Sequence, residues 1–228
     1  MILKVKKKHQ IWFFDLDDTL HDASNGPLNK IDQMMNDEIQ RLLLVNREKA
    51  DELRLYYWKK YGATVIGLNK IHNVSSKSFL AATHSIKEKN ISITPTLQLA
   101  ETLKLLVGRK WIVTNSPRIY AIEILKRLKI KNYFEKIITI EKMSVNGLIK
   151  PKPHIIQWKK LVRLSGVSPK AITVVDDNLN NLKSAKQLGC RTVWAECYRK
   201  SGVLDNKYIK SHTYVDCRIK KISSLLRI

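Results

Sequence analysis

Short apolar runs alternate with longer amphipathic stretches along this chain. The apolar runs that are typical of buried parallel strands cover residues 11–14, 111–113, 137–140, 171–175 and 192–195. Apolar residues recur at helical spacing over residues 96–107, 118–128, 155–164 and 179–188. Strands that alternate with helices predict an α/β fold, in which a parallel sheet carries helices on both faces as a Rossmann-like three-layer α/β/α core.

One long stretch breaks this alternation. From residue 23 to residue 90 the pattern is helical only, and the chain returns to the sheet near residues 94–95. We therefore predict a core made of residues 1–22 and 91–228, with an all-helical cap of residues 23–90 inserted after the first strand. The tail is expected to add a short strand around residues 214–217 and a last helix.

The length and composition agree with one core that carries an insert. The chain has 228 residues, of which 44% are hydrophobic. No apolar run approaches the roughly 20 residues that a membrane span needs, so no membrane partner is expected. The three cysteines match no zinc or redox spacing, which predicts reduced thiols in a cytoplasmic protein.

The formal net charge of +22 has two interpretations. It could mark a nucleic-acid-binding surface, or it could reflect a lysine-rich composition. The lysines are spread over the whole chain, and no arginine- and aromatic-rich block resembles an RNA-binding module. A nucleic-acid partner is therefore the less favoured expectation, although the charge would help to attract an anionic ester.

The candidate chemistry begins directly after the first predicted strand. Asp15 and Asp17 lie two residues apart, and side chains at this spacing in an extended segment point the same way. Two such carboxylates repel each other unless a cation or a proton lies between them. A hard cation with oxygen ligands, such as Mg²⁺, suits this pair. The alternative is an ordinary acidic turn at the end of a strand.

Further segments extend this pair into a set of four motifs. The chain contains Phe-Phe-Asp-Leu-Asp-Asp-Thr-Leu at 13–20, Ile-Val-Thr-Asn-Ser at 112–116, Lys-Pro at 152–153 before a predicted helix, and Val-Val-Asp-Asp at 174–177. These motifs, in this order, resemble those of the haloacid dehalogenase superfamily of phosphohydrolases. The resemblance covers nearly the whole chain.

The resemblance implies a phosphatase mechanism that starts at Asp15. Asp15 would attack phosphorus and form an aspartyl-phosphate, and Asp17 would act as the acid and then the base. Mg²⁺ would be held by the Asp15 carboxylate, the Asp17 backbone carbonyl and Asp177. Dehalogenases of this superfamily lack the second Asp, so Asp17 favours phosphoryl transfer.

The remaining motif residues would support this chemistry. By the same resemblance, Thr114 and the backbone N–H of Asn115 would bind the phosphoryl oxygens, and Lys152 would supply positive charge. Asp176 would position Lys152 from outside the metal shell, and Asn181 would orient metal-bound water. Taken alone, residues 114–115 could be a helix cap and Lys152 a solvated side chain. Lys150 offers an alternative alignment of the lysine.

The substrate depends on the predicted cap. Residues 55–64, 72 and 79–84, together with residues 17–21 and 193–195, are similar to the pyrimidine 5′-nucleotidase-like branch of the superfamily. This similarity implies a pyrimidine nucleoside 5′-monophosphate as the substrate, with His21, Tyr57 and Tyr61 as candidate substrate-binding residues. The aromatic residues of the cap could stack on a base, but their spacing equally suits packing between cap helices.

Two other readings stay open. A sugar-phosphate or phosphoglycolate phosphatase, or a phosphomutase, would use the same core with another cap preference. A basic nucleic-acid-binding protein built on an inactive core would need neither metal nor substrate. The oligomeric state is not indicated by the sequence.

Overall fold

A parallel sheet of six strands forms the centre of the molecule. The computed structural model describes residues 10–86, 92–145, 148–198 and 212–228. The strand order is β3-β2-β1-β6-β7-β8, with parallel pairing throughout. In chain order these strands are β1 (Ile11–Phe14), β2 (Arg109–Val113), β3 (Lys136–Ile138), β6 (Ile172–Asp176), β7 (Arg191–Ala195) and β8 (Cys217–Ile219).

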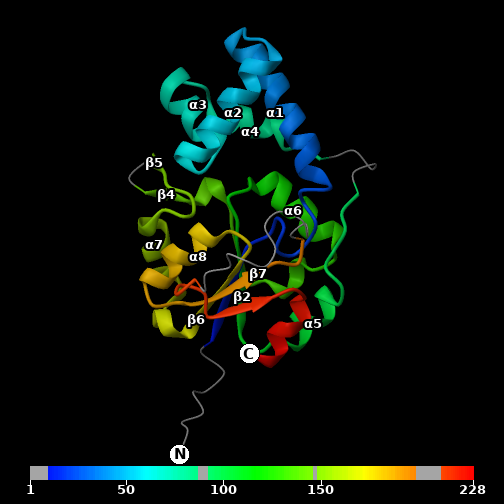
Figure 1. Cartoon of the computed structure of the whole chain (residues 1–228), viewed down its shortest axis with the longest axis vertical. Helices are drawn as coiled ribbons and strands as arrows, with labels where there is room; N and C mark the ends of the chain where they lie inside the picture. Colours follow the sequence, from blue (N-terminus) through cyan, green and yellow to red (C-terminus); the bar gives the residue numbers. More distant parts are fainter. Residues whose placement is uncertain (1–9, 87–91, 146–147, 199–211) are drawn as a thin grey trace, which may run out of the picture.

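Helices cover both faces of this sheet. One face carries α5 (Leu99–Leu105), α6 (Arg118–Arg127) and a C-terminal 3-10 helix (Ile222–Arg227). The other face carries α7 (Ile155–Ser165) and α8 (Leu179–Gln187). Figure 1 shows α7 and α8 on one side of the sheet and α5 on the other. The predicted three-layer α/β/α fold is confirmed.

The first strand explains how the layers hold together. Trp12 and Phe14 belong to the hydrophobic core on the α5–α6 face, whereas Ile11 and Phe13 belong to the core on the α7–α8 face. This division follows from the alternation of side chains along a strand. All four side chains are buried, as expected for a central strand that is covered on both faces.

The strand order brings three carboxyl ends together. Phe14 pairs with Ile112 of β2 on one side and with Val175 of β6 on the other. The connections from β1 therefore run in opposite directions across the sheet, which makes β1 its topological switch point. In open parallel sheets, ligands bind in the crevice at such a point, outside the carboxyl ends of the strands.

Four helices lie beyond this end of the sheet, as Figure 1 shows. They are α1 (Pro27–Leu43), α2 (Arg47–Tyr61), α3 (Thr64–His72) and α4 (Ser76–Thr83). Asn46 and Ser75 cap α2 and α4 with their side chains, and Gly62 ends α2 in a left-handed conformation. Most of their buried apolar side chains form a separate hydrophobic cluster, whereas Ile31 of α1 belongs to the core on the α5–α6 face. The division of the chain at residues 23 and 91 stays a prediction, and residue 91 lies outside the described residues.

The contacts between the helical layer and the core include backbone bonds and packed side chains. The backbone N–H of Asp22 donates to the carbonyl of Thr94 at 2.9 Å, beside a bridge between His21 and Pro95. A hairpin of β4 (Ser144–Val145) and β5 (Leu148–Ile149) also packs against the helical layer, through Ile149. Strands of two residues carry no readable periodicity, so the sequence did not predict this hairpin.

Several predicted boundaries differ from the structure. The α5 helix begins at Leu99 rather than at residue 96, because Gln98 adopts a left-handed conformation (φ 60°). The third run ends as a strand at Ile138, and a 3-10 helix follows at Ile140–Lys142. The last strand, β8, is displaced toward the C-terminus, and the final helix is of the 3-10 type. None of the helices described here combines the length and the apolar character that crossing a bilayer requires.

Candidate active site

Asp15 and Lys152 form the centre of the site. Asp15 follows β1 directly, and its backbone N–H donates to the carbonyl of Val175 at 2.9 Å, which fixes it at the switch point. The Nζ of Lys152 lies 2.9 Å from Oδ1 of Asp15 and 2.7 Å from Oδ2 of Asp176. Lys152 is 2% exposed, so these two carboxylates neutralise a buried ammonium group. They hold the pKa of Lys152 above its usual value although burial alone would lower it.

Asp176 is held on all sides. Its Oδ1 accepts bonds from the backbone N–H of Asn178 and from Nδ2 of Asn181, both at 2.9 Å. The same amide of Asn181 lies 3.0 Å from Oδ2, which also receives Lys152. Asp176 therefore positions Lys152, and Asn181 positions Asp176. Asp176 thus contacts the lysine that it was expected to position, whereas the Asn181 amide binds Asp176, and its expected role in orienting metal-bound water stays a prediction.

Three carboxylates gather closely enough to share a cation. One oxygen each of Asp15, Asp176 and Asp177 lie within 4.8 Å of one another. Burial raises the pKa of Asp15 to about 7 and that of Asp177 to about 9, and the neighbouring negative charges add to both shifts. The Asp177 carboxylate accepts only a long bond of 3.4 Å, from Thr19, among the contacts described. Three carboxylates with a single lysine as their charged partner retain negative charge, and such a group of oxygen donors suits a hard divalent cation such as Mg²⁺.

Asp17 occupies a different environment from Asp15. Its Oδ2 accepts from the Ser116 hydroxyl at 2.6 Å, and its Oδ1 accepts from the Tyr120 hydroxyl at 2.6 Å and contacts Nε2 of His21 at 3.0 Å. Burial alone would raise the pKa of Asp17, but these three partners outweigh it and hold the pKa below its usual value. The Asp17 side chain is not one of the three carboxylates that gather, so only its backbone carbonyl is a candidate metal ligand.

Thr114 and Asn115 end β2 beside this group. Thr114 is buried, and its hydroxyl accepts from the backbone N–H of Ser116 at 3.0 Å. The Asn115 side chain donates to the carbonyl of Lys152 at 2.9 Å and accepts from its backbone N–H at 3.0 Å. The Asn115 side chain thus fixes the backbone of Lys152, a role that the sequence did not reveal.

The predicted substrate-binding residues divide into two groups. His21 is buried at Asp17 and belongs to the site. Tyr61 lines a cleft of about 1180 Å³ that also reaches Asn115, Lys152 and Asn181. Tyr57 lies within the hydrophobic cluster of the helical layer, where its hydroxyl meets Nε2 of His72 at 2.8 Å. The structure therefore does not bring Tyr57 to the carboxylates.

Sequence reasoning missed several residues of the site. Ser116 and Tyr120 bind Asp17, and Thr19 bonds to Asp177. Ser116 and Thr19 lie within the recognised motifs, so the motif residues beside them could have indicated that they belong to the site. Tyr120 occupies a buried helix position that no local pattern distinguishes from core. His84 lies edge-to-face against Tyr120 at 6.4 Å, and burial lowers its pKa to about 4.

A parallel-sheet core with an aspartate, a buried lysine and an acidic cluster at its switch point defines an α/β enzyme. Residues 12–195 match the family of haloacid dehalogenase-like hydrolases. The match covers most of the chain, and the chain belongs to this family.

Three relatives are each 27% identical to this chain. A glyceraldehyde 3-phosphate phosphatase of Pyrococcus furiosus aligns over 97% of this chain and 93% of its own length. A phosphoglycolate phosphatase of Pectobacterium atrosepticum aligns over 79% and 77%. Phosphate metabolism protein 8 of Saccharomyces cerevisiae aligns over 79% of this chain, which spans only 59% of that protein.

The fold is shared with solved structures of the family. The crystal structure of a phosphatase from Thermococcus onnurineus superposes with a TM-score of 0.63 over 96% of each chain, at 20% identity. At this identity the similarity concerns the fold alone.

Proposed function

We propose that this hydrolase is a Mg²⁺-dependent phosphatase that cleaves small phosphate monoesters of the sugar-phosphate or phosphoglycolate type. The observation that carries the proposal is the contact of Asp15 with the buried Lys152. Asp177 lies next to Asp15, whereas the Asp17 carboxylate is separate from this group and is bound by its own partners. Two of the three relatives described above are phosphatases of such small esters.

Asp15 is the proposed nucleophile. One of its carboxylate oxygens attacks phosphorus, the bond from phosphorus to the ester oxygen breaks, and an aspartyl-phosphate forms. Asp15, Asp177 and the backbone carbonyl of Asp17 would hold Mg²⁺, which would neutralise charge when the anionic ester approaches the Asp15 carboxylate. Lys152 and Thr114 stabilise the negative oxygens of the transferred group.

Asp17 is the proposed acid and base. An arriving phosphate ester brings negative charge next to this carboxyl and raises its pKa, which favours a protonated Asp17. The proton passes to the leaving alkoxide, and the resulting carboxylate then takes a proton from the water that attacks the phosphorus of the aspartyl-phosphate. Ser116, Tyr120 and His21 keep the carboxylate in position for both steps.

Pyrimidine nucleoside 5′-monophosphates are the second candidate substrates. The cap sequence at residues 55–64 favours them, whereas the names of the aligned phosphatases favour the smaller esters. The buried position of Tyr57 removes one of the residues that was expected to contact a base. A phosphomutase would leave a phosphorylated product instead of free phosphate.

The proposal is tested by phosphate release from a panel of esters. The panel contains glyceraldehyde 3-phosphate, 2-phosphoglycolate, ribose 5-phosphate and uridine 5′-monophosphate, each with Mg²⁺ and with a chelator. We expect Mg²⁺-dependent release that is fastest with the small esters. A preference for the nucleotide would reverse the order of the two candidates. No release from any ester, together with a salt-dependent mobility shift of RNA, would support the inactive-core reading.

A further inference from the structure

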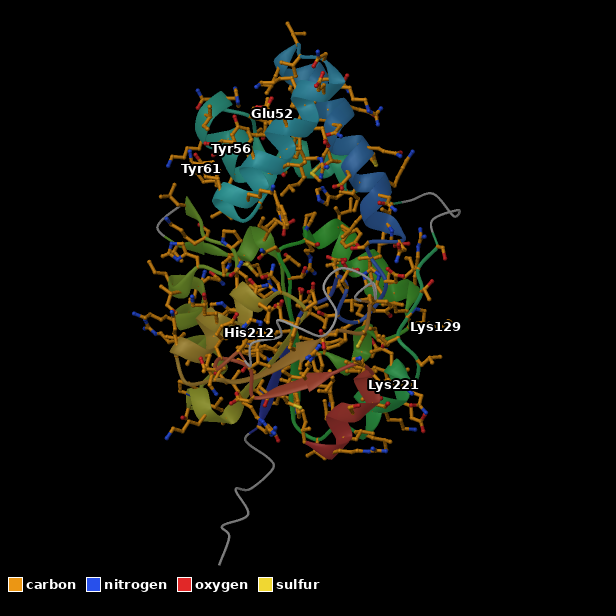
Figure 2. The ribbon with its side chains drawn as sticks, viewed as in Figure 1. Glu52, Tyr56, Tyr61, Lys129, His212 and Lys221 are labelled. Carbon is orange, nitrogen blue, oxygen red and sulfur yellow. The ribbon has the colours of Figure 1, made fainter. Side chains whose placement is uncertain are left out.

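A cleft lined by cations adjoins the catalytic loop. It lies between the end of α2, α3, the hairpin β4–β5 and the starts of α4, α7 and α8, and its volume is about 1180 Å³. Figure 2 labels Tyr61 at this end of α2, on the side of the molecule where Figure 1 shows the hairpin. The lysine and histidine side chains in its lining can each carry a positive charge: Lys59, Lys60, Lys70, Lys150, Lys152 and His154. No Asp or Glu is among the described lining residues.

The outer lysines of this cleft lack acidic partners. Lys152 is neutralised by Asp15 and Asp176, but no ion pair among the described residues involves Lys59, Lys60, Lys70 or Lys150. Elsewhere on the surface, lysines such as Lys49 do find a carboxylate. A concentration of like charges without counter-charge is costly, and a bound anion would relieve it.

Aromatic side chains hold two of these lysines in the cleft. The Nζ of Lys60 lies 5.5 Å from the centre of the Tyr61 ring, and that of Lys70 lies 5.7 Å from it. The Lys60 ammonium also donates to the Tyr56 hydroxyl at 2.7 Å. These cation–π contacts gather the ammonium groups without neutralising them. Trp58, which is 53% exposed, adds a flat apolar wall.

The cleft and the nucleophile share one side chain. Lys152 lines the cleft, while its Nζ touches Asp15 at 2.9 Å. Asn115 and Asn181, which fix Lys152 and Asp176, line the same cleft. A ligand at the end of the cleft that Lys152 lines therefore lies next to the proposed site of phosphoryl transfer.

We infer that this cleft binds a second phosphate group, carried by the leaving group of the substrate. The inference rests on the proposed function and narrows it to bisphosphorylated esters. The scissile phosphate would lie at Asp15, the carbon skeleton along Trp58 and Tyr61, and the second phosphate among Lys59, Lys60 and Lys70. Several point charges suit a phosphate dianion better than a single carboxylate.

The test compares two esters that differ in one phosphate. Steady-state kinetics with ribose 5-phosphate and ribose 1,5-bisphosphate give a KM for each, on wild type and on the double variant Lys59→Gln/Lys70→Gln. We expect the wild-type KM to be about fivefold lower for the bisphosphate. The double variant should lose this ratio. Lys77→Gln, an exposed lysine on α4 outside the cleft, is the matched control and should keep it.

Any of three outcomes overturns the inference while the proposed function stands. The first is equal KM values for both esters in the wild type, and the second is a ratio that survives in the double variant. Calorimetric titration with inorganic phosphate separates a third outcome, in which Lys59 and Lys70 bind a free anion and the KM ratio is one; this too overturns the assignment to the substrate. If neither these two esters nor any ester of the panel is cleaved, the proposed function fails. Calorimetry with the bisphosphate then still tests the cleft, since the double variant should bind it more weakly.

Discussion

The carboxyl end of the core sheet and the helical layer above it use polar side chains in different ways. At the sheet, Asp17 accepts short bonds from Ser116 and Tyr120, which are 99 and 103 positions away, and Asp176 accepts one from Lys152, 24 positions away. In the helical layer, the hydroxyl of the buried Tyr57 meets His72 within the layer itself, and the lysines around Tyr61 have no carboxylate partner among the residues that the structure describes. The comparison suggests that the core fixes the chemistry, whereas the helical layer presents an adaptable charged surface to the substrate.

A second contrast lies within the core. Asp15 and Asp17 are two residues apart, yet burial raises the pKa of Asp15 to about 7 while bonds from His21, Ser116 and Tyr120 hold that of Asp17 below its usual value. Environments that move two carboxyl groups in opposite directions are typical of sites where the two have different roles.

The largest expected effect is that of Asp15→Asn. An amide of the same shape is a poor nucleophile, so turnover should fall by at least about 10⁴-fold. Phosphate release measures the effect, and thermal unfolding is the control, since the folded structure should persist. Substantial remaining turnover would contradict the assignment of the nucleophile.

Lys152→Ala should damage stability as well as activity. It leaves Asp15 and Asp176 buried without their cation, which typically costs about 3–5 kcal/mol in free energy of unfolding. Lys150→Ala is the matched control, and its cost should stay below about 0.5 kcal/mol. Denaturant unfolding of both variants measures the difference. A larger loss of stability in Lys150→Ala than in Lys152→Ala would indicate that Lys150 is the lysine of the motif.

Mg²⁺ should offset part of the effect of pH on stability. The folded-state pKa values of Asp15 and Asp177 are raised from 3.8 to about 7 and about 9. The folded protein therefore binds more protons than the unfolded chain, and this contribution to stability is full below pH of about 4 and is lost as pH rises through 7 toward 9. At about 100 times its Kd, Mg²⁺ should add about 2.7 kcal/mol at high pH. A thermal unfolding series with Mg²⁺ or chelator tests this. An unfolding temperature at pH 8 that Mg²⁺ leaves unchanged would argue against the metal site.

Tyr120→Phe should act through Asp17. It removes one donor to the carboxylate, so the pKa of Asp17 should rise and the acidic limb of the pH–rate profile should move to higher pH. The lost bond to a charged group should cost about 2 kcal/mol of stability near neutral pH, and less at low pH where Asp17 is protonated. Tyr133→Phe, a partly buried tyrosine that packs against the same hydrophobic cluster, is the control and should leave the profile in place.

The smallest effect should come from Tyr57→Phe. The loss of its bond to His72 should cost about 1 kcal/mol in stability, with the KM for each ester unchanged. Tyr61→Phe is the companion variant on the cleft side of the same helix. A raised KM for uridine 5′-monophosphate in Tyr57→Phe alone would restore this tyrosine as a substrate contact.

The core could be predicted from sequence because its signals are local. Buried strands such as Ile11–Phe14 are continuous apolar runs, and Asp15 and Asp177 directly follow the strands β1 and β6. Tyr120 could not be found in this way, since its bond to Asp17 spans 103 positions and its own surroundings resemble core. The hairpin at Ser144–Ile149 is too short to show a period.

The substrate contacts of the helical layer could not be predicted from sequence for a related reason. The spacing of Tyr57 and Tyr61 fits both a base-stacking face and internal packing, and only the tertiary structure separates the two residues. The cleft gathers Lys59, Lys70 and Lys150 from three elements, so no stretch of sequence reveals it.

The most direct test of the account is to trap the phosphoryl group on the protein. The wild type is mixed with Mg²⁺ and the fastest ester of the panel, quenched in acid during turnover, and digested for mass spectrometry. The account predicts that the peptide carrying Asp15 gains one phosphoryl group, and that Asp15→Asn shows no such gain. Rapid turnover without phosphorylation of that peptide, or phosphorylation of another residue, would contradict it.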